Sequence, residues 1–153
     1  MRFSDVFTSK DSIQLDKKTL VILRWLAFVG QFLTIGFVYF ILNFKIYFFY
    51  CSLIIFLGVL TNFYLQIKVK VNQLNSFTST IFLCYDVFQL SLLLYLNGGI
   101  TNPFVILLII PAIVASTFLK LRNTINLSII TIVFLIVLTI DHFPLPHSGE
   151  LHF

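Results

Sequence analysis

The run of residues 20–42, LVILRWLAFVGQFLTIGFVYFIL, decides the class of protein to which this sequence belongs. It is a continuous apolar stretch whose one charged residue is Arg24, close to its start. An α-helix needs about 20 predominantly apolar residues to cross the hydrocarbon core of a bilayer. The run therefore predicts a membrane-spanning helix. Arg24 is expected to extend to the membrane surface through its long side chain, with Trp25 beside it as an interfacial anchor.

Four further apolar runs follow, and the composition of the whole chain agrees with them. They cover residues 46–67, 77–96, 104–119 and 125–140. Hydrophobic residues make up 59% of the 153 residues and charged residues only 10%, which excludes a water-soluble domain. Because a backbone in lipid must satisfy its own hydrogen bonds, each run is expected to be α-helical. The sequence predicts an all-α integral membrane protein, a polytopic bundle of five transmembrane helices over residues 20–141, whose two shorter runs recruit flanking residues.

The basic residues are distributed unevenly between the two ends of these helices. Only Lys45 falls on one side, whereas the other basic residues fall on the opposite side. Lysine and arginine are enriched in cytoplasmic loops, so the N-terminus is expected in the cytoplasm. Residues 1–19 then form a cytoplasmic or interfacial segment, with Asp11 or Ser12 as a helix cap, and residues 142–153 lie in the periplasm. The net charge of +4 reflects this topology and attraction to the lipid bilayer, so no nucleic-acid partner is implied.

Few residues of the chain are of a type that carries catalysis or binds metal. Cys51 and Cys84 lie inside apolar runs, where a thiol behaves as a small hydrophobic group. His142, His147 and His152 share a proline-containing tail, and their spacing does not suit a zinc site. The sequence contains no nucleotide-binding glycine loop and no nucleophile placed beside a base. We therefore expect no catalytic residue and no metal site.

The uncharged segment 96–104, LNGGITNPF, connects the third and fourth runs. Gly98 and Gly99 are expected to end the third helix with positive φ angles, and Asn102-Pro103 is typical of a helix start. Two adjacent glycines and a helix N-terminus would also leave backbone N–H groups open to a ligand, beside the flat ring of Phe104. This combination suits a planar, lipid-soluble molecule with carbonyl oxygens, such as a quinone. A well-capped turn is the alternative explanation of the same residues.

Three polar side chains, Gln31, Asp86 and Gln89, lie at similar depths in the first and third runs. Because these two helices run in the same direction, the three side chains are expected to face one another inside the bundle. They form either ordinary interhelical hydrogen bonds or a functional cluster, in which a protonated Asp86 couples the loop to helix packing. Pro111 is expected to kink the fourth helix and to free a carbonyl near Leu107.

Several stretches resemble the RegB/PrrB family of redox-sensing histidine kinases. TLVILRWLAFVGQ (19–31) is similar to the first span of that family, and DVFQLSLLLYLNGGITNPF (86–104) to its third span and GGxxNPF loop. FPLPHSGELHF (143–153) is similar to the loop that leads into its sixth span. The resemblance runs over nearly the whole chain beyond the polar start.

The resemblance implies a sensor of the quinone pool in a bacterial inner membrane. In that family the loop binds ubiquinone, which carries over to Gly98, Gly99, Asn102, Pro103 and Phe104. The resemblance also implies a homodimer and a kinase that uses ATP and Mg²⁺ to pass a phosphoryl group to a response regulator. The sixth span, the phosphoacceptor histidine helix and the ATP-binding boxes of the family are absent from these residues. We therefore expect a sensor region that ends before its last helix, with any kinase activity in a longer parent protein.

Two functions of other classes remain as alternatives. The chain could be half of a transporter, with Asp86 and the break at Pro111 forming a translocation site. It could also be a stand-alone membrane subunit that binds quinone or a partner protein without signalling by itself.

Overall fold

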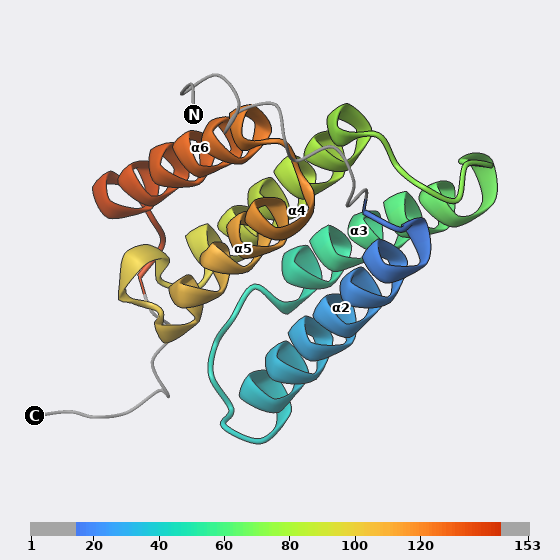
Figure 1. Cartoon of the computed structure of the whole chain (residues 1–153). Helices are drawn as coiled ribbons and strands as arrows, with labels where there is room; N and C mark the ends of the chain where they lie inside the picture. Colours follow the sequence, from blue (N-terminus) through green and yellow to red (C-terminus); the bar gives the residue numbers. More distant parts are fainter. Residues whose placement is uncertain (1–14, 145–153) are drawn as a thin grey trace, which may run out of the picture.

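The computed structural model of this chain describes residues 15–144, which are folded almost entirely into helices. Figure 1 shows the long helices lying with their axes roughly parallel. The helices are α2 (Lys17–Phe40), α3 (Phe48–Lys68), α4 (Ser76–Leu96), the 3₁₀ helices η1 (Gly99–Thr101) and η2 (Pro103–Leu108), α5 (Ile109–Phe118) and α6 (Leu121–Ile140). The all-α prediction is confirmed, since extended pairing within residues 15–144 is limited to one isolated bridge between Asp16 and Gln73.

Four of the described helices are long and apolar enough to cross a membrane, namely α2, α3, α4 and α6. This supports the multi-pass membrane character predicted from the sequence. The fourth expected run corresponds to η2 and α5, which together cover Pro103–Phe118 and are shorter. The helix of the last run, α6, begins at Leu121, before the expected start at residue 125, so it recruits flanking residues as expected. The fifth crossing and the orientation of the N-terminus stay predictions.

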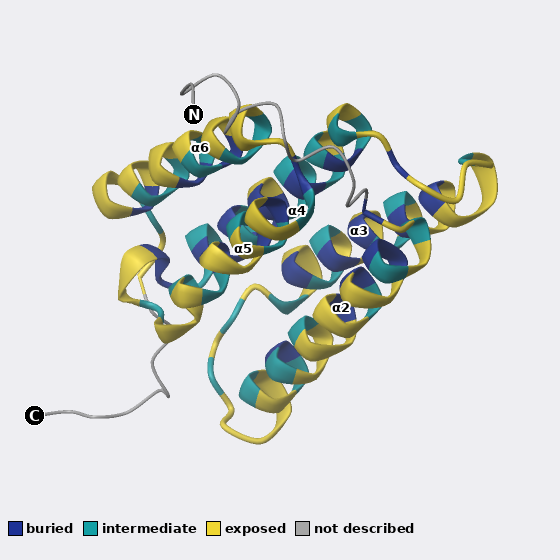
Figure 2. Ribbon diagram, in the orientation of Figure 1, coloured by how far each residue is buried: buried dark blue, intermediate teal, exposed yellow. Residues whose placement is uncertain are grey.

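α4 is the helix around which the others are arranged. It packs against α3 and also against α5 and α6, whereas α2 packs mainly against α3. One group of buried side chains joins α4 to α6 through residues such as Val87 and Leu127, and a second joins α2 to α3 through Phe28 and Ile55. Figure 2 shows that the outward faces of the helices are largely exposed. Many of their side chains are large and apolar, as expected for surfaces that contact lipid.

The start of α2 is tied to the end of α3. Asp16 is the N-cap of α2, and its side chain accepts a hydrogen bond from a backbone N–H in the first turn. The ammonium group of Lys17 donates to the carbonyl oxygen of Val69 at 2.7 Å, at the C-terminal end of α3. A positive charge is favourable at that end of a helix dipole. The caps expected at Asp11 or Ser12 lie outside the described residues.

The segment that corresponds to the fourth expected span is divided into two helices of different type. η2 ends before Ile109, whose N–H donates to the carbonyl oxygens of Ile106 and Leu107. Pro111 lies in the first turn of α5, where its missing N–H would have had no partner within that α-helix. The expectation of a free Leu107 carbonyl therefore needs correction, while the kink at Pro111 stays a prediction. The change of helix type precedes the proline, and the Leu107 carbonyl is an acceptor.

Candidate functional site

A cavity of about 540 Å³ lies between α2, α4 and the η2–α5 segment. Most of its lining is aliphatic, and its volume falls in the range of ligand-binding pockets. The polar residues that line it are Arg24, Gln31, Thr34, Asp86, Gln89, Asn97 and Asn102. Pro103 and Phe104 line it as well. The cavity thus brings together two features that the sequence analysis treated separately, the LNGGITNPF loop and the polar residues inside the spans.

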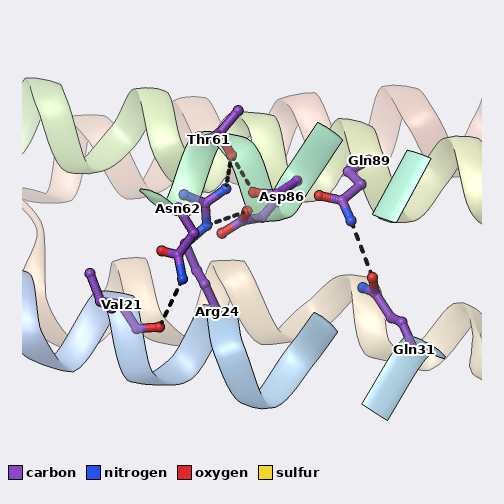
Figure 3. A network of polar contacts seen from close by, with 8 residues as sticks. Val21, Arg24, Gln31, Thr61, Asn62, Asp86 and Gln89 are labelled. Atoms are coloured by element: carbon purple, nitrogen blue, oxygen red, sulfur yellow. Dashed lines mark hydrogen bonds and ion pairs between the residues drawn. The ribbon is translucent and has the colours of Figure 1, made fainter. Parts of the chain in front are cut away.

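Arg24 and Asp86 form an ion pair at one end of this cavity. The Nε of Arg24 donates to Oδ1 of Asp86 at 2.9 Å, and its Nη2 donates to the hydroxyl of Thr61 at 2.7 Å (Figure 3). The Arg24 side chain is 2% exposed and that of Asp86 is 18% exposed. The guanidinium also lies over the rings of Phe28 and Phe82, with its carbon 5.4 and 5.2 Å from the ring centres. These contacts connect α2 to α3 and α4.

The expectation that Arg24 extends to the membrane surface is wrong, because a carboxylate lies within its reach. Gln31 of α2 and Gln89 of α4 lie at the same depth, and the two helices run in the same direction. Asp86, which precedes Gln89 by one turn, is therefore level with Phe28, which precedes Gln31 by one turn. Arg24 lies one turn earlier, a gap of about 6 Å at 1.5 Å per residue, which a long arginine side chain can span. A charge buried in an apolar bundle is tolerated when it is paired and hydrogen-bonded. One positive charge in the first span and one negative charge in the third span were the sequence signal for this pair.

The structure brings Gln31 and Gln89 together. The Nε2 of Gln89 donates to Oε1 of Gln31 at 3.1 Å, between α4 and α2 (Figure 3). Gln89 is 2% exposed, and its amide lies against Gly58 of α3, where a side chain would overlap it. Asp86, which was expected to join the two glutamines, pairs with Arg24 instead. The predicted cluster is thus two neighbouring polar contacts, and sequence reasoning did not identify Arg24, Thr61 or Gly58 as parts of it.

The LNGGITNPF loop has the backbone conformation that its sequence indicated. Gly98 and Gly99 have φ angles of 103° and 53°, so both lie in the left-handed region that favours glycine. Asn102 is the N-cap of η2, and its Oδ1 accepts from the N–H of Phe104 at 2.9 Å. Its Nδ2 donates to the carbonyl oxygen of Asn97 at 2.8 Å. Asn102 therefore holds both sides of the loop together, while the 44%-exposed ring of Phe104 lines the cavity.

Several backbone donors that were expected to be open to a ligand are used within the loop itself. The N–H groups of Thr101, Asn102 and Val105 donate to the carbonyl oxygens of Gly98, Gly99 and Asn102, respectively. The N–H of Phe104 donates to the side chain of Asn102. At this end the cavity is therefore lined by Asn102, Pro103 and Phe104 rather than by a row of free donors. The quinone site assigned by resemblance stays a prediction.

The two glycines are buried and do not line the cavity. A side chain on Gly99 would overlap the side chain of His142, which follows α6. The same segment is held by a hydrogen bond of 2.9 Å from the N–H of Phe143 to the carbonyl oxygen of Tyr95, and the hydroxyl of Tyr95 donates to Asp141 at 3.1 Å. The segment that follows α6 thus packs against the buried Gly99 of the loop. The sequence did not reveal this contact, because it joins distant parts of the chain.

Metal ligands do not cluster in the part of the chain that the structure describes. Within residues 15–144 no group of three His, Cys, Asp or Glu side chains could hold a metal ion. His147 and His152 lie outside the described residues, so the expectation of no metal site stays a prediction.

Comparison with known proteins gives one informative relative. No family model and no solved structure matches this chain. It is 33% identical over 129 residues to the sensor histidine kinase RegB of Cereibacter sphaeroides. The alignment covers 84% of this chain but only 28% of the relative. Together with the apolar helices, this similarity supports a RegB-like N-terminal membrane region.

Proposed function

We propose that this chain is the membrane sensor region of a RegB-like two-component histidine kinase, and that it senses the redox state of the quinone pool. One observation supports the proposal most directly. The loop residues Asn102, Pro103 and Phe104 line a cavity of about 540 Å³ whose remaining walls are mostly aliphatic. An aromatic ring and aliphatic walls at the end of membrane helices suit a flat, lipid-soluble head group such as that of ubiquinone or a related quinone.

The proposed topology places this cavity inside a bacterial inner membrane. The N-terminus lies in the cytoplasm, and the 16 residues of Pro103–Phe118 form a short fifth crossing between α4 and α6. The distribution of lysine and arginine supports this arrangement, since Lys45 is alone on the periplasmic side. Under this proposal the LNGGITNPF loop is periplasmic, and α2 begins on the side where the kinase of a longer protein would lie.

The proposed signal is a change in helix packing. The cavity separates α2 from the η2–α5 segment, while α4 contributes to its lining between them. A ligand in this position contacts three helices at once, so it favours the arrangement of helices that binds it more tightly. Oxidised and reduced quinone shift the balance between two arrangements only to the extent that their affinities for them differ.

The output of the signal belongs to a longer protein. We propose that the longer protein is a homodimer whose kinase region uses ATP and Mg²⁺ and transfers a phosphoryl group to a response regulator. The similarity to a sensor histidine kinase supports this assignment, and the chain spans only 28% of that relative.

Replacement of loop residues tests the quinone site. Phe104→Ala should weaken quinone binding about tenfold, because it removes the ring that would stack on the ligand. Asn102→Ala should weaken it as well, since Asn102 braces the loop through both atoms of its amide. Binding is measured by titrating a short-chain ubiquinone into the chain reconstituted in lipid nanodiscs.

A matched control comes from the same short helix. Ile106 lies in η2, is 70% exposed and does not line the cavity, so Ile106→Ala should bind quinone like the parent chain. Circular dichroism establishes that each variant keeps its helical content. The proposed site is contradicted if folded Asn102→Ala and Phe104→Ala proteins bind quinone as tightly as the parent does.

A further inference from the structure

The segment that follows α6 closes the C-terminal end of α4. Asp141 is the C-cap of α6 and has an extended backbone, so the chain leaves the helix at this residue. Two residues later, the N–H of Phe143 donates to the carbonyl oxygen of Tyr95 at 2.9 Å. The last carbonyl groups of an α-helix have no partner within the helix itself. The segment therefore supplies a donor that the end of α4 lacks.

The ring of Phe143 connects the same segment to the start of α3. Its centre lies 5.4 Å from the ring centre of Tyr47 and 5.5 Å from that of Tyr95, with both pairs in edge-to-face orientation. Tyr47 is the N-cap residue of α3. The hydroxyl of Tyr95 also donates to Oδ2 of Asp141 at 3.1 Å. One short segment, which continues from the end of α6, thus contacts the start of α3 and the end of α4.

His142, between Asp141 and Phe143, lies against the LNGGITNPF loop. A Cβ added to Gly99 would overlap Cβ and the ring of His142, so this side chain packs directly on the backbone of the loop. Nδ1 of His142 is buried and has no hydrogen-bond partner among the described residues. Packing on Gly99, rather than a hydrogen bond at Nδ1, therefore positions this part of the ring. Because packed groups do not compress, a shift of Gly99 toward His142 must displace the imidazole.

Gly99 also lies among the hydrogen bonds that hold the loop. The N–H of Thr101 donates to the carbonyl oxygen of Gly98 at 3.0 Å, and the N–H of Asn102 donates to that of Gly99 at 3.2 Å. The two acceptors are the residue on which His142 packs and its neighbour. Movement of the imidazole therefore acts on both of these bonds.

We propose that residues 141–143 form a strap that couples the LNGGITNPF loop to the chain that follows α6. A displacement of the loop at Gly99 alters the strap, and a force on the strap alters the loop, because a coupling free energy between two sites is reciprocal. The strap gives the loop a connection that passes through neither α2 nor the cavity. The inference involves no ligand, so it stands apart from the proposed function.

Hydrogen exchange of single backbone amides tests the strap. The parent chain in lipid nanodiscs, without ligand, is compared with Phe143→Ala, which removes both ring contacts. The amide of residue 143 reports on the strap, and the amides of Thr101 and Asn102 report on the loop. Protection of all three amides should fall about tenfold, since opening of the strap lowers the local stability of the loop. Unchanged protection at Thr101 and Asn102 would overturn the inference.

Reciprocity supplies a test from the other side. Asn102→Ala removes the side-chain hydrogen bonds to Asn97 and Phe104, so it loosens the loop without replacing a residue of the strap. It should lower the protection of the amide at residue 143. Ile140→Ala is the matched control, because Ile140 directly precedes the strap and is 80% exposed, and it should leave all three amides unchanged. An unaltered amide at residue 143 in Asn102→Ala would contradict the coupling.

His142→Ala decides the case if Phe143→Ala does not fold. His142 is half-buried and lies outside the helices, and its replacement removes the imidazole from Gly99 while the rings of the strap remain. Protection at Thr101 and Asn102 should fall. In the combined variant, Asn102→Ala should lower the protection of residue 143 less than it does in the parent chain, since the contact that couples the two sites is gone. Equal effects of Asn102→Ala in both backgrounds would overturn the inference.

Discussion

At Gly58 the absence of a side chain leaves room for the amide of Gln89. A Cβ at this position would overlap the Gln89 side chain, which is 2% exposed and hydrogen-bonded to Gln31. Gly58→Ala should therefore displace Gln89 and break its contact with α2. We expect the free energy of unfolding to fall by about 1–3 kcal/mol, as is typical when a methyl group is added to a packed interior. Unfolding in mixed detergent micelles, followed by circular dichroism, measures this change.

Gly36→Ala provides the comparison for Gly58→Ala, because a Cβ at Gly36 meets nothing within 4 Å. Both glycines lie inside long helices, where alanine is intrinsically favoured over glycine by about 1 kcal/mol. Gly36→Ala should therefore leave stability unchanged or raise it. If both substitutions have the same effect, Gly58 does not act through its contact with Gln89.

At the scale of helices, the sequence predicted the features that are set by residues close together in the chain. It did not predict the contacts between residues that are far apart in the chain. The apolar runs predict the helices because a spanning segment must be long and apolar, whatever it packs against. The caps at Asn102 and the glycines at 98–99 are also local, since an N-cap and a positive φ angle are set by a few adjacent residues. These features are present in the structure.

The burial of Arg24 was not predictable in this way. A lone arginine near the end of a span reaches the membrane surface by default, and the partner that keeps it inside lies 62 residues further along the chain. The contact between Gly99 and His142 is of the same kind, because it depends on the return of the chain after α6 to the loop. For the same reason, the cavity between α2, α4 and η2–α5 becomes visible only when the helices are placed in space.

The ion pair between α2 and α4 leads to a prediction about these two helices. Arg24→Met should lower the free energy of unfolding by about 3–5 kcal/mol, because it leaves the buried carboxylate of Asp86 without its partner. The double variant Arg24→Met with Asp86→Leu carries no buried charge and should be more stable than Arg24→Met alone. Detergent unfolding of the parent chain, both single variants and the double variant provides the comparison. Additive losses would show that the two charges do not stabilise each other.

At the scale of the whole molecule, the shape of the cavity follows from which helices are in contact. α4 packs against α3, α5 and α6, while α2 is held through α3, through the Arg24–Asp86 pair and through the contact between Gln31 and Gln89. Two polar contacts beside the cavity thus link α2 directly to α4. A ligand in this cavity would therefore contact α2, which is the first helix of the described residues.

Topology is the remaining prediction for the whole molecule, and Pro103–Phe118 is its critical segment because it is shorter than the other spans. We expect this segment to cross the membrane, which places Thr101 and Lys45 in the periplasm and Lys70 and Lys120 in the cytoplasm. In a chain with Cys51 and Cys84 replaced by alanine, cysteines at residues 45 and 101 should react with a membrane-impermeant maleimide in intact spheroplasts. Cysteines at residues 70 and 120 should react only after lysis. Labelling of residues 101 and 120 from the same side would show that the segment does not cross.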